Sequence, residues 1–466
     1  MYLEQFFIEG LGCASYLVGC EGAGIAAVID PDRDVQKYLD TAAAHGMTIT
    51  HIIETHLHAD HVSGNTDLAA QTNAEIYVHE AAQAEFPHQT LRGGDSIALG
   101  HVELRVRFTP GHTPESITLL VVDKTRADDP WMALTGDTLF VGDAGRPDLV
   151  GREAARDLAG HMHDTLHNEY LTLADGVMIL PGHGAGSLCG KSIGSVLSST
   201  LGFERHHNPA LQVHNREAYI EFATAGLPEQ PGNHKRIKQV NRQGPRALGV
   251  VTPHPLNTQQ AVLQFRQGAA LLDTRPKAAY RAKHIPGAVH LEADMQLSNR
   301  VGFVLPPNTP IILMLADVSD YRRVVYSLAR VGYDNVVGSL ADPLSTWEAL
   351  GLPTTSGDVL DIEPQELNTL LESAARPIVV DVRESWEYTQ GHIPGARLIS
   401  LGEFAQRVNE LDPKQPIAVI CASGGRSQSA AALLGQKGFE TVYNVVGGTF
   451  NWMQHGLPIE RNQEKN

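Results

Sequence analysis

Cysteine is scarce in this sequence, and its few residues are not spaced as pairs. Cys13, Cys20, Cys189 and Cys421 are scattered over 466 residues, and no two of them form a Cys-X-X-Cys motif. This usage argues against a disulfide framework and fits a reducing cytoplasm, where we expect the protein to reside. Each cysteine therefore needs its own explanation.

Long apolar runs and an excess of positive charge are also missing. No stretch of about 18 apolar residues occurs, so we expect no membrane span. The first residues, MYLEQFFIEGLG, lack the basic start and the apolar core of a signal peptide. The formal net charge of −17 favours solubility and would be repelled by phosphate backbones, so nucleic acid is not an expected partner.

What the sequence does contain is the pattern of several α/β domains. A chain of 466 residues with 42% hydrophobic residues can build more than one core. Within residues 1–225, short apolar runs such as 49–55, 102–108 and 117–122 alternate with helical spacing at 34–45 and 152–168. We therefore predict a layered α/β domain over residues 1–225.

The remainder of the chain begins with a change in composition and then repeats itself. Residues 226–250 are rich in proline, glycine and basic residues, which predicts an interdomain linker. The segments LLDTRP at 271 and HIPGA at 284 recur as VVDVRE at 379 and HIPGA at 392, an offset of 108 residues. We predict two similar α/β domains, over residues 251–355 and 356–466.

Side chains suited to metal binding follow several apolar runs of the first domain. Histidine nitrogens and carboxylate oxygens suit zinc, iron and manganese. One group lies in the run HLHADH, and each of the others follows a glycine after an apolar segment; the seven candidates are His56, His58, Asp60, His61, His112, Asp137 and His183. Strand ends that deliver ligands from several elements are typical of α/β sites, so the sequence predicts a metal site there.

These motifs, in this order, resemble those of the metallo-β-lactamase superfamily. The resemblance covers about residues 1–225 and implies a four-layer αββα sandwich with metals at the edges of the strands. It specifies the fold but leaves two reactions open. One is a zinc-dependent thioester hydrolase of the glyoxalase II type, in which two metals share Asp137. The other is a dioxygenase with one ferrous ion and open faces for substrate and oxygen.

A finer resemblance favours the dioxygenase. Segments 110–116 and 136–148 resemble the persulfide dioxygenases, which implies a mononuclear Fe(II) site with His56, His112 and Asp137 as ligands. It also implies that four further residues stay without metal and orient ligands and water: His58, Asp60, His61 and His183. The same residues could hold a second zinc, so zinc remains the alternative metal. Arg146 either pairs with a substrate carboxylate or forms a salt bridge within its loop.

The second repeat contains a candidate nucleophile. Cys421 follows the apolar run 417–420 and begins the sequence CASGGRS, ahead of a predicted helix. Backbone N–H groups, the helix dipole and Arg426 would lower the pKa of this thiol, although a buried structural cysteine is the alternative. The repeats resemble the rhodanese sulfurtransferases, which implies that Cys421 is the active cysteine and that its loop holds sulfane sulfur.

The first repeat and the other three cysteines give no comparable indication of catalysis. Leu315 stands where the second repeat has Cys421, and two acidic residues follow it, so the first repeat should be catalytically silent and serve as a spacer or docking platform. Cys13 and Cys20 flank an apolar strand and are expected in the core. Cys189 follows His183 and is either close to the site or structural.

Together these interpretations predict a persulfide dioxygenase coupled to a sulfurtransferase, in sulfide detoxification or sulfur metabolism. A persulfide of glutathione, coenzyme A, cysteine or another small thiol reacts with O2 to give sulfite, and Cys421 supplies or accepts sulfane sulfur, with thiosulfate as the joint product. The sulfur transfer could run in either direction. The alternatives are a zinc thioesterase with a sulfur-trafficking tail, and a tail that only senses or docks persulfides. By analogy with related dioxygenases, we expect a homo-oligomer.

Overall fold

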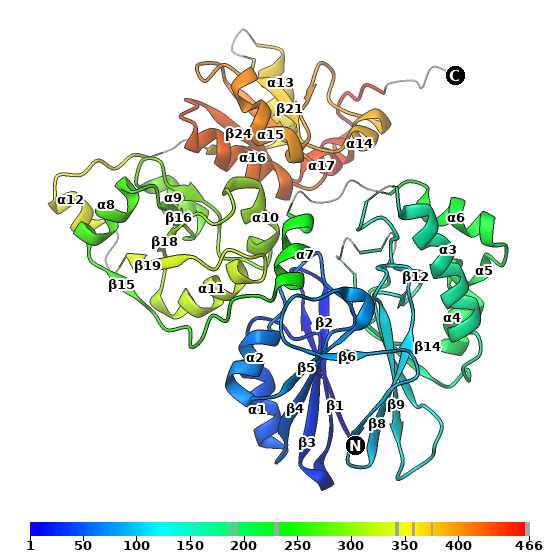
Figure 1. Ribbon diagram of the computed structural model, residues 1–466. Coiled ribbons are helices and arrows are strands. Elements are labelled where there is room, and N and C mark those ends of the chain that lie inside the picture. The colour runs from blue at the N-terminus through cyan, green and yellow to red at the C-terminus, as the bar shows by residue number, and fades with distance from the viewer. Residues whose placement is uncertain are drawn as a thin grey trace. The chain divides into compact units, whose positions relative to one another are not determined.

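The computed structural model describes residues 1–151, 153–185, 187, 189–190, 193–227, 233–340, 344–356, 359–373 and 376–461. It divides into two compact units, residues 1–250 with 329–332 and residues 251–328 with 333–466 (Figure 1). Residues 228–232 of the predicted linker, and residues 357–358 beside the predicted boundary between the repeats, lie outside the described residues.

The first unit contains two six-stranded sheets. The first sheet has the order β1 (Tyr2–Ile8), β2 (Cys13–Cys20), β3 (Ile25–Ile29), β4 (Thr48–Ile53), β5 (Glu75–His79), β6 (Gln89–Leu91). The second has the order β14 (Ser199–Thr200), β13 (Met178–Pro181), β10 (Met132–Gly136), β9 (Ile117–Asp123), β8 (Val102–Phe108), β7 (Ser96–Leu99). A short hairpin joins β11 (Leu139–Phe140) and β12 (Asp143–Ala144).

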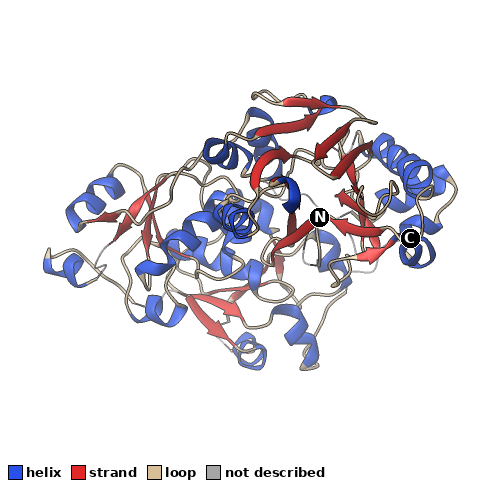
Figure 2. Cartoon of the chain, turned by 90° about the horizontal axis from the view of Figure 1, so that it is seen from below, coloured by secondary structure: helices blue, strands red, loops and turns tan. Residues whose placement is uncertain are grey.

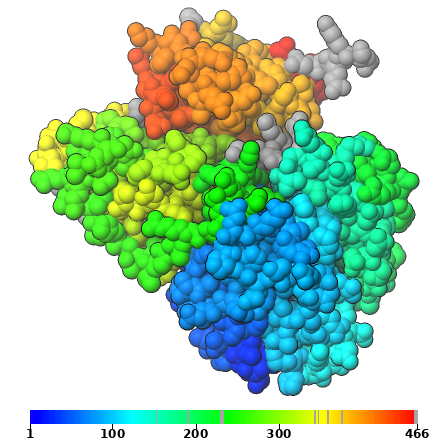
Figure 3. Space-filling view, viewed as in Figure 1, coloured from blue at the N-terminus to red at the C-terminus, as the bar shows by residue number. Residues whose placement is uncertain are grey.

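Burial explains how these sheets stack. Strand β8 alternates buried and less buried residues, as expected where only one face is covered closely, whereas β9 is buried along its whole length. One apolar core lies between the sheets and includes Val18, Ile29, Leu104 and Leu119. In the space-filling view, residues of the first sheet, in blue, lie beside residues of the second sheet, in cyan (Figure 3).

Helices cover the outer faces of both sheets. Helices α1 (Gln36–Ala44) and α2 (Asn65–Thr72) share a second core with the first sheet. The second sheet shares a third core with α3 (Ala155–Thr165), the π-helical turn Leu166–Tyr170, α4 (Leu201–His207), α5 (Pro209–Gln212) and α6 (Arg216–Thr224). The predicted αββα sandwich is confirmed.

The topology brings the predicted ligands to one edge of the sandwich. Strands β3, β4 and β5 run parallel, and β4 leads into the loop of His56. Strands β10 and β13 are also parallel neighbours and lead to Asp137 and His183. Strand β8 is antiparallel to β9, as β9 is to β10, so the end of β8 before His112 faces the same way as those of β10 and β13.

The predicted linker is partly a helix of the first unit. Helix α7 (His234–Gln243) buries His234, Ile237 and Asn241. These residues recur at spacings of three and four, which is the period of an α-helix. Composition alone suggested a linker because the other positions of this helix are basic or polar.

The second unit contains two five-stranded parallel sheets of the same order. The first is β15 (Pro255–Leu256), β19 (Val336–Leu340), β18 (Ile311–Met314), β16 (Ala270–Asp273), β17 (Val289–His290). The second is β20 (Val359–Ile362), β24 (Val442–Val445), β23 (Ile417–Ile420), β21 (Ile378–Asp381), β22 (Arg397–Leu398). The predicted pair of parallel α/β domains is confirmed.

Helices connect the strands of each repeat, and Figure 2 shows them in blue beside the red strands. The first repeat has α8 (Thr258–Arg266), α9 (Lys277–Ala282), α10 (Leu297–Val304), α11 (Tyr321–Ala329) and α12 (Ser345–Ala349). The second has α13 (Pro364–Leu371), α14 (Ser385–Gln390), α15 (Leu401–Arg407), α16 (Gly425–Gln436) and α17 (Gly448–Gln454). Throughout the described part of the chain, the helices are too short or too polar to cross a membrane.

Candidate metal centre and sulfur-transfer site

Three of the predicted ligands form a compact, buried group. His56 follows β4, His112 follows β8 and Asp137 follows β10. The Oδ2 atom of Asp137 lies 3.2 Å from Nε2 of His112 and 3.8 Å from Nε2 of His56. One donor atom from each side chain lies within 4.8 Å of the other two, which is the proximity that a shared metal ion requires.

The free atoms of this triad fit a metal ion. Nε2 of His112 and Oδ2 of Asp137 are buried and have no hydrogen-bond partner among the described residues. Buried polar atoms are normally bonded, so two unpaired atoms that face each other are suited to bind a cation. Two imidazoles and one carboxylate suit ferrous iron in a facial triad, and they also suit zinc.

The outer nitrogens of both histidines are held by hydrogen bonds. Nδ1 of His112 donates to the carbonyl of Arg146 over 2.9 Å, and Nδ1 of His56 lies 3.0 Å from the Thr55 hydroxyl. These bonds leave each Nε2 lone pair directed at the triad. Burial and the neighbouring His58 hold the pKa of His56 well below its ordinary value, so this imidazole is neutral, as a metal ligand must be.

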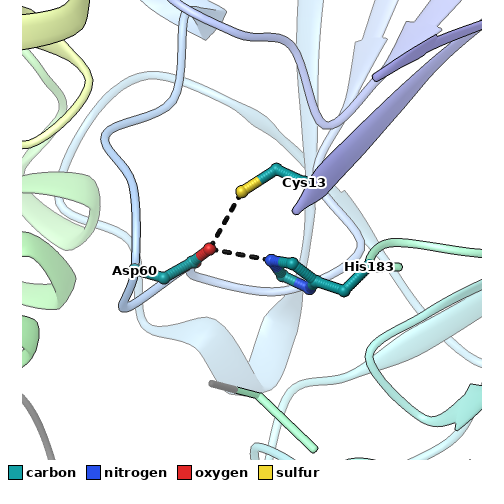
Figure 4. A group of neighbouring side chains, drawn as sticks. All are labelled: Cys13, Asp60 and His183. Carbon is teal, nitrogen blue, oxygen red and sulfur yellow. Dashed lines mark hydrogen bonds and ion pairs between the residues drawn. The ribbon is translucent and has the colours of Figure 1, made fainter. Parts of the chain in front are cut away.

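His183 and Asp60 form a hydrogen-bonded chain beside the triad. His183 contacts Oδ1 of Asp137 through Nδ1 at 2.6 Å and Oδ2 of Asp60 through Nε2 at 2.7 Å. The Cys13 thiol donates to the same Asp60 oxygen over 3.0 Å, as Figure 4 shows. Nδ1 of His61 lies 3.2 Å from the other Asp60 oxygen. These candidate second-site residues are thus bonded to one another and to the triad.

His58 faces a different pair of acidic residues. Its Nε2 lies 3.2 Å from Oδ1 of Asp30 and 3.4 Å from Oε2 of Glu54, and all three side chains are buried. Burial by itself would lower the pKa of His58, but the two carboxylates outweigh it and raise the pKa to about 9. Among the described residues, His58 is not grouped with His56, His112 and Asp137, but its donor atom lies within 4.8 Å of those of Asp60 and His61, which makes these three a separate candidate group for a metal ion.

Two cysteines lie closer to the site than their sequence context indicates. Cys13 was expected in the apolar core, but its thiol bonds Asp60 and lies 3.7 Å from His61. A long-range pairing of β2 with the loop after β13, the isolated bridge of Cys13 and His183, puts it there, and no local pattern reveals such a pairing. Cys20 is in the core, as expected. Cys189 groups with Asp137 and His183, which places this buried thiol beside the site.

Arg146 is held by an acidic neighbour within its own loop. Its Nε and Nη2 atoms donate to the two Asp148 oxygens over 2.6 and 2.8 Å, and both side chains are almost fully buried. This arrangement matches the salt-bridge alternative for Arg146. A contact between Arg146 and substrate stays a prediction.

The loop of Cys421 surrounds the thiol with small groups. Cys421 directly follows β23, and its Sγ accepts a hydrogen bond from the backbone N–H of Gly424 over 3.1 Å. The Ser427 hydroxyl lies 3.5 Å from the same sulfur. Arg426, expected to assist the thiolate, donates instead to both oxygens of Glu387 over 2.6 and 2.7 Å. The nearest donor to the sulfur is therefore backbone.

The register of the two sheets identifies the counterpart of Cys421 in the first repeat. Ile420 pairs with Asp381 in the second repeat, and Met314 pairs with Asp273 in the first. The next residues, Cys421 and Leu315, therefore occupy equivalent positions, as the sequence alignment of the repeats predicts.

Models of two protein families match the chain. The model of the metallo-beta-lactamase superfamily matches residues 8–183, and that of the rhodanese-like domain matches residues 258–350 and 363–455. A metallo-beta-lactamase crystal structure from Staphylococcus aureus is 34% identical, with a TM-score of 0.63; the match covers 73% of this chain and 98% of that one.

The curated relatives include hydrolases and dioxygenases. A hydroxyacylglutathione hydrolase of Rhodospirillum rubrum is 38% identical over 133 residues, which are 28% of this chain and 49% of that protein. The mitochondrial persulfide dioxygenase ETHE1 of Bos taurus is 30% identical over 232 residues, which are 49% of this chain and 82% of that protein. The chain spans only 49–61% of the length of the hydrolases it matches, but most of the dioxygenase.

Proposed function

The chain belongs to the metallo-β-lactamase superfamily and carries two rhodanese-like domains, and from this premise we propose that it is a persulfide dioxygenase coupled to a sulfurtransferase. In this proposal the first domain oxidises the persulfide of a small thiol with O2, and Cys421 handles sulfane sulfur.

The triad of His56, His112 and Asp137 is the observation that carries this proposal. Two imidazoles and one carboxylate are the ligand set of mononuclear ferrous dioxygenases, and a ferrous ion held there supplies the redox chemistry that couples O2 to sulfur. His183 and Asp60 bond each other, and His58 faces Asp30 and Glu54. These contacts support a single metal whose ligands are oriented by the remaining residues.

The proposed reaction balances with one water molecule. A thiol persulfide RSSH, one O2 and one H2O give the free thiol RSH, sulfite and two protons. The persulfides of glutathione, coenzyme A and cysteine share this reacting group. The relative named persulfide dioxygenase supports a substrate of this class.

The second domain repeat supplies the proposed sulfur transfer. A persulfide on Cys421 loses its outer sulfur to sulfite, which gives thiosulfate and the Cys421 thiolate; the same step in reverse loads the cysteine from thiosulfate. The Gly424 N–H donates a hydrogen bond to Sγ and supports the anionic forms.

A zinc-dependent thioester hydrolase is the second candidate. His58, Asp60 and His61 favour it, because they form a separate group of donor atoms that could hold a second metal, and so does the similarity to hydroxyacylglutathione hydrolases.

Metal analysis combined with two assays separates the candidates. We expect the purified protein to contain about one iron per chain and to consume O2 when a thiol persulfide is added, without hydrolysing glutathione thioesters. Protein that contains zinc, consumes no O2 and hydrolyses thioesters would establish the hydrolase instead.

A further inference from the structure

Asp30 lies at the end of strand β3, next to the end of the strand that leads to His56. It directly follows β3, whose last residue, Ile29, pairs with Ile53 at the end of the parallel strand β4. The backbone N–H of Asp30 donates to the Ile53 carbonyl over 2.9 Å. With φ +52°, Asp30 adopts the left-handed conformation, which is uncommon for a residue other than glycine. Strained backbone of this kind clusters at functional sites, so the Asp30 side chain is a candidate for a role there.

The Asp30 carboxylate holds Thr55 by two hydrogen bonds. Oδ1 accepts from the Thr55 backbone N–H and Oδ2 from the Thr55 hydroxyl, each over 2.7 Å, and both residues are buried. The Thr55 carbonyl in turn accepts from the N–H of Ile117, the first residue of β9. A Cβ at Gly136, the residue before Asp137, would lie 2.7 Å from the Thr55 hydroxyl oxygen. Thr55 is therefore held from several sides at the edge of the sandwich where the triad lies.

These bonds determine which nitrogen of His56 carries the proton. The Thr55 hydroxyl has a single hydrogen, and it donates that hydrogen to the Asp30 carboxylate, which can only accept. Nδ1 of His56 lies 3.0 Å from the same hydroxyl oxygen, so Nδ1 is the donor in that contact. A neutral imidazole protonated at Nδ1 keeps its lone pair on Nε2, the nitrogen that lies 3.8 Å from Oδ2 of Asp137. The chain of hydrogen bonds from Asp30 through Thr55 thus selects the metal-binding tautomer of His56.

His112, the other histidine of the triad, is oriented by a neutral group. Its Nδ1 donates to the backbone carbonyl of Arg146. His56 instead connects through one hydroxyl to a carboxylate, whose negative charge makes the Nε2 lone pair a stronger metal ligand. Oδ1 of Asp30 also lies 3.2 Å from Nε2 of His58. One buried carboxylate therefore acts on two histidines of the metal loop.

We propose that Asp30 and Thr55 are positioning residues for the metal ion, which hold His56 in the tautomer that binds the ion and strengthen that bond. This inference rests on the metal centre of the proposed function and deepens it. It applies to iron and to zinc, because either ion takes the Nε2 lone pair. It predicts that reversing one hydrogen bond weakens metal binding although every ligand is retained.

Three substitutions separate the hydrogen bonds from the packing. Thr55→Val replaces the hydroxyl with a methyl group and keeps the shape, whereas Thr55→Ser keeps the hydroxyl. Asp30→Asn reverses the chain: the Thr55 N–H can only donate, so it retains the amide oxygen and leaves the NH2 group facing the hydroxyl. The hydroxyl then donates to Nδ1 of His56, and the imidazole proton moves to Nε2, the nitrogen that would bind the metal.

Binding of Co2+ is the main readout, because the visible absorption of this ion reports its coordination and requires no enzyme activity. Each variant is titrated with Co2+ in competition with a chelator, and denaturant unfolding of the metal-free protein is followed separately. Thr48→Val is the matched control, because Thr48 is exposed on strand β4.

We expect Thr55→Val and Asp30→Asn each to weaken Co2+ binding by about 10- to 100-fold, while Thr55→Ser and Thr48→Val bind as the wild type does. Because both substitutions break the same chain, the double variant should bind Co2+ no more weakly than Asp30→Asn alone. The comparison of Asp30→Asn with Thr55→Ser keeps the test valid if Thr55→Val does not fold.

Three results would overturn the inference. The first is wild-type Co2+ binding by Asp30→Asn or Thr55→Val. The second is an equal loss in Thr55→Ser and Thr55→Val, which would show that the threonine methyl group matters and not the hydroxyl. The third is a fully additive loss in the double variant, which would show that the two residues act separately. None of these depends on the reaction, whereas failure of the dioxygenase is seen as wild-type protein that consumes no O2, so the two failures are distinguishable.

Discussion

The two rhodanese-like repeats share a set of framework contacts and differ in the loop that follows the central strand. In each, an aspartate at a strand end receives the guanidinium of an arginine two residues later: Asp273 and Arg275 in the first, Asp381 and Arg383 in the second. The histidine of each HIPGA segment stacks on a tyrosine, with ring centroids 3.9 and 3.6 Å apart. These interactions explain why the motifs recur, because they stabilise the same strand end in each repeat.

The loops after the central strands differ in how they use backbone donors. In the second repeat the Gly424 N–H points at Cys421 Sγ. In the first repeat the Asp317 carboxylate accepts from the Ser319 N–H, so an internal acid occupies a donor that could serve an anion. The two repeats therefore share their framework contacts and differ both in the thiol and in the use of backbone donors in this loop.

Replacement of Cys421, the proposed nucleophile, should produce the largest difference between the repeats. We expect Cys421→Ser to reduce sulfur transfer from thiosulfate to cyanide by more than about a thousandfold, because a hydroxyl cannot carry sulfane sulfur. Oxygen uptake with a thiol persulfide should be unchanged and serves as the internal control. Transfer that survives the substitution would show that Cys421 is not the carrier.

Removal of Asp273 or Asp381, the aspartates of the shared framework contacts, should reduce the stability of both repeats alike. We expect Asp381→Ala and Asp273→Ala each to cost about 3–5 kcal/mol of unfolding free energy, since each leaves a buried arginine without its carboxylate. Denaturant unfolding of both variants measures this. A large loss of stability in one variant and none in the other would show that the two aspartates do not have equivalent roles.

In the second repeat, the backbone at Gly448 lies close to the backbone of Cys421 and Ala422. Gly448 has φ +62°, and a Cβ there would overlap the Cys421 carbonyl and lie 2.6 Å from the Ala422 carbonyl carbon. We expect Gly448→Ala to cost about 1–3 kcal/mol and to slow transfer. Gly456→Ala is the control, because Gly456 has φ +63° with open space around it. Equal losses in stability, measured by thermal unfolding, would show that backbone strain rather than this contact decides the effect.

Restoring the thiol to the first repeat should have the smallest effect. In a Cys421→Ser background, we expect Leu315→Cys to restore no measurable transfer, because Asp317 keeps the nearby N–H occupied. The thiosulfate–cyanide assay measures this directly. Substantial recovery would mean that the missing cysteine alone silenced this repeat.

Much of the fold follows from local pattern, whereas contacts between distant segments do not. The predicted strand 102–108 coincides with β8 because its side chains alternate in burial along the sheet. The repeat predicted both parallel sheets and the equivalence of Leu315 with Cys421. Helix α7 was missed because its buried residues are polar as well as apolar.

In the candidate site, too, local motifs predicted which residues gather, but not the contacts between distant segments. Motif order indicated the seven polar residues of the candidate metal site, but not the hydrogen bond of Cys13 to Asp60, which joins residues 47 positions apart. Glu387, the partner of Arg426, is 39 residues away from it. Such pairings depend on which strands become neighbours, and that is set by the packing of the whole domain.

The most direct test of the proposed persulfide dioxygenase activity is oxygen consumption by the Cys421→Ser variant. This variant cannot convert sulfite to thiosulfate through that cysteine, so the sulfite that forms can be measured. With iron-containing protein and a thiol persulfide, we predict that one sulfite forms for each O2 consumed. Protein that contains iron and consumes no O2 with a thiol persulfide, while hydrolysing glutathione thioesters, would contradict it.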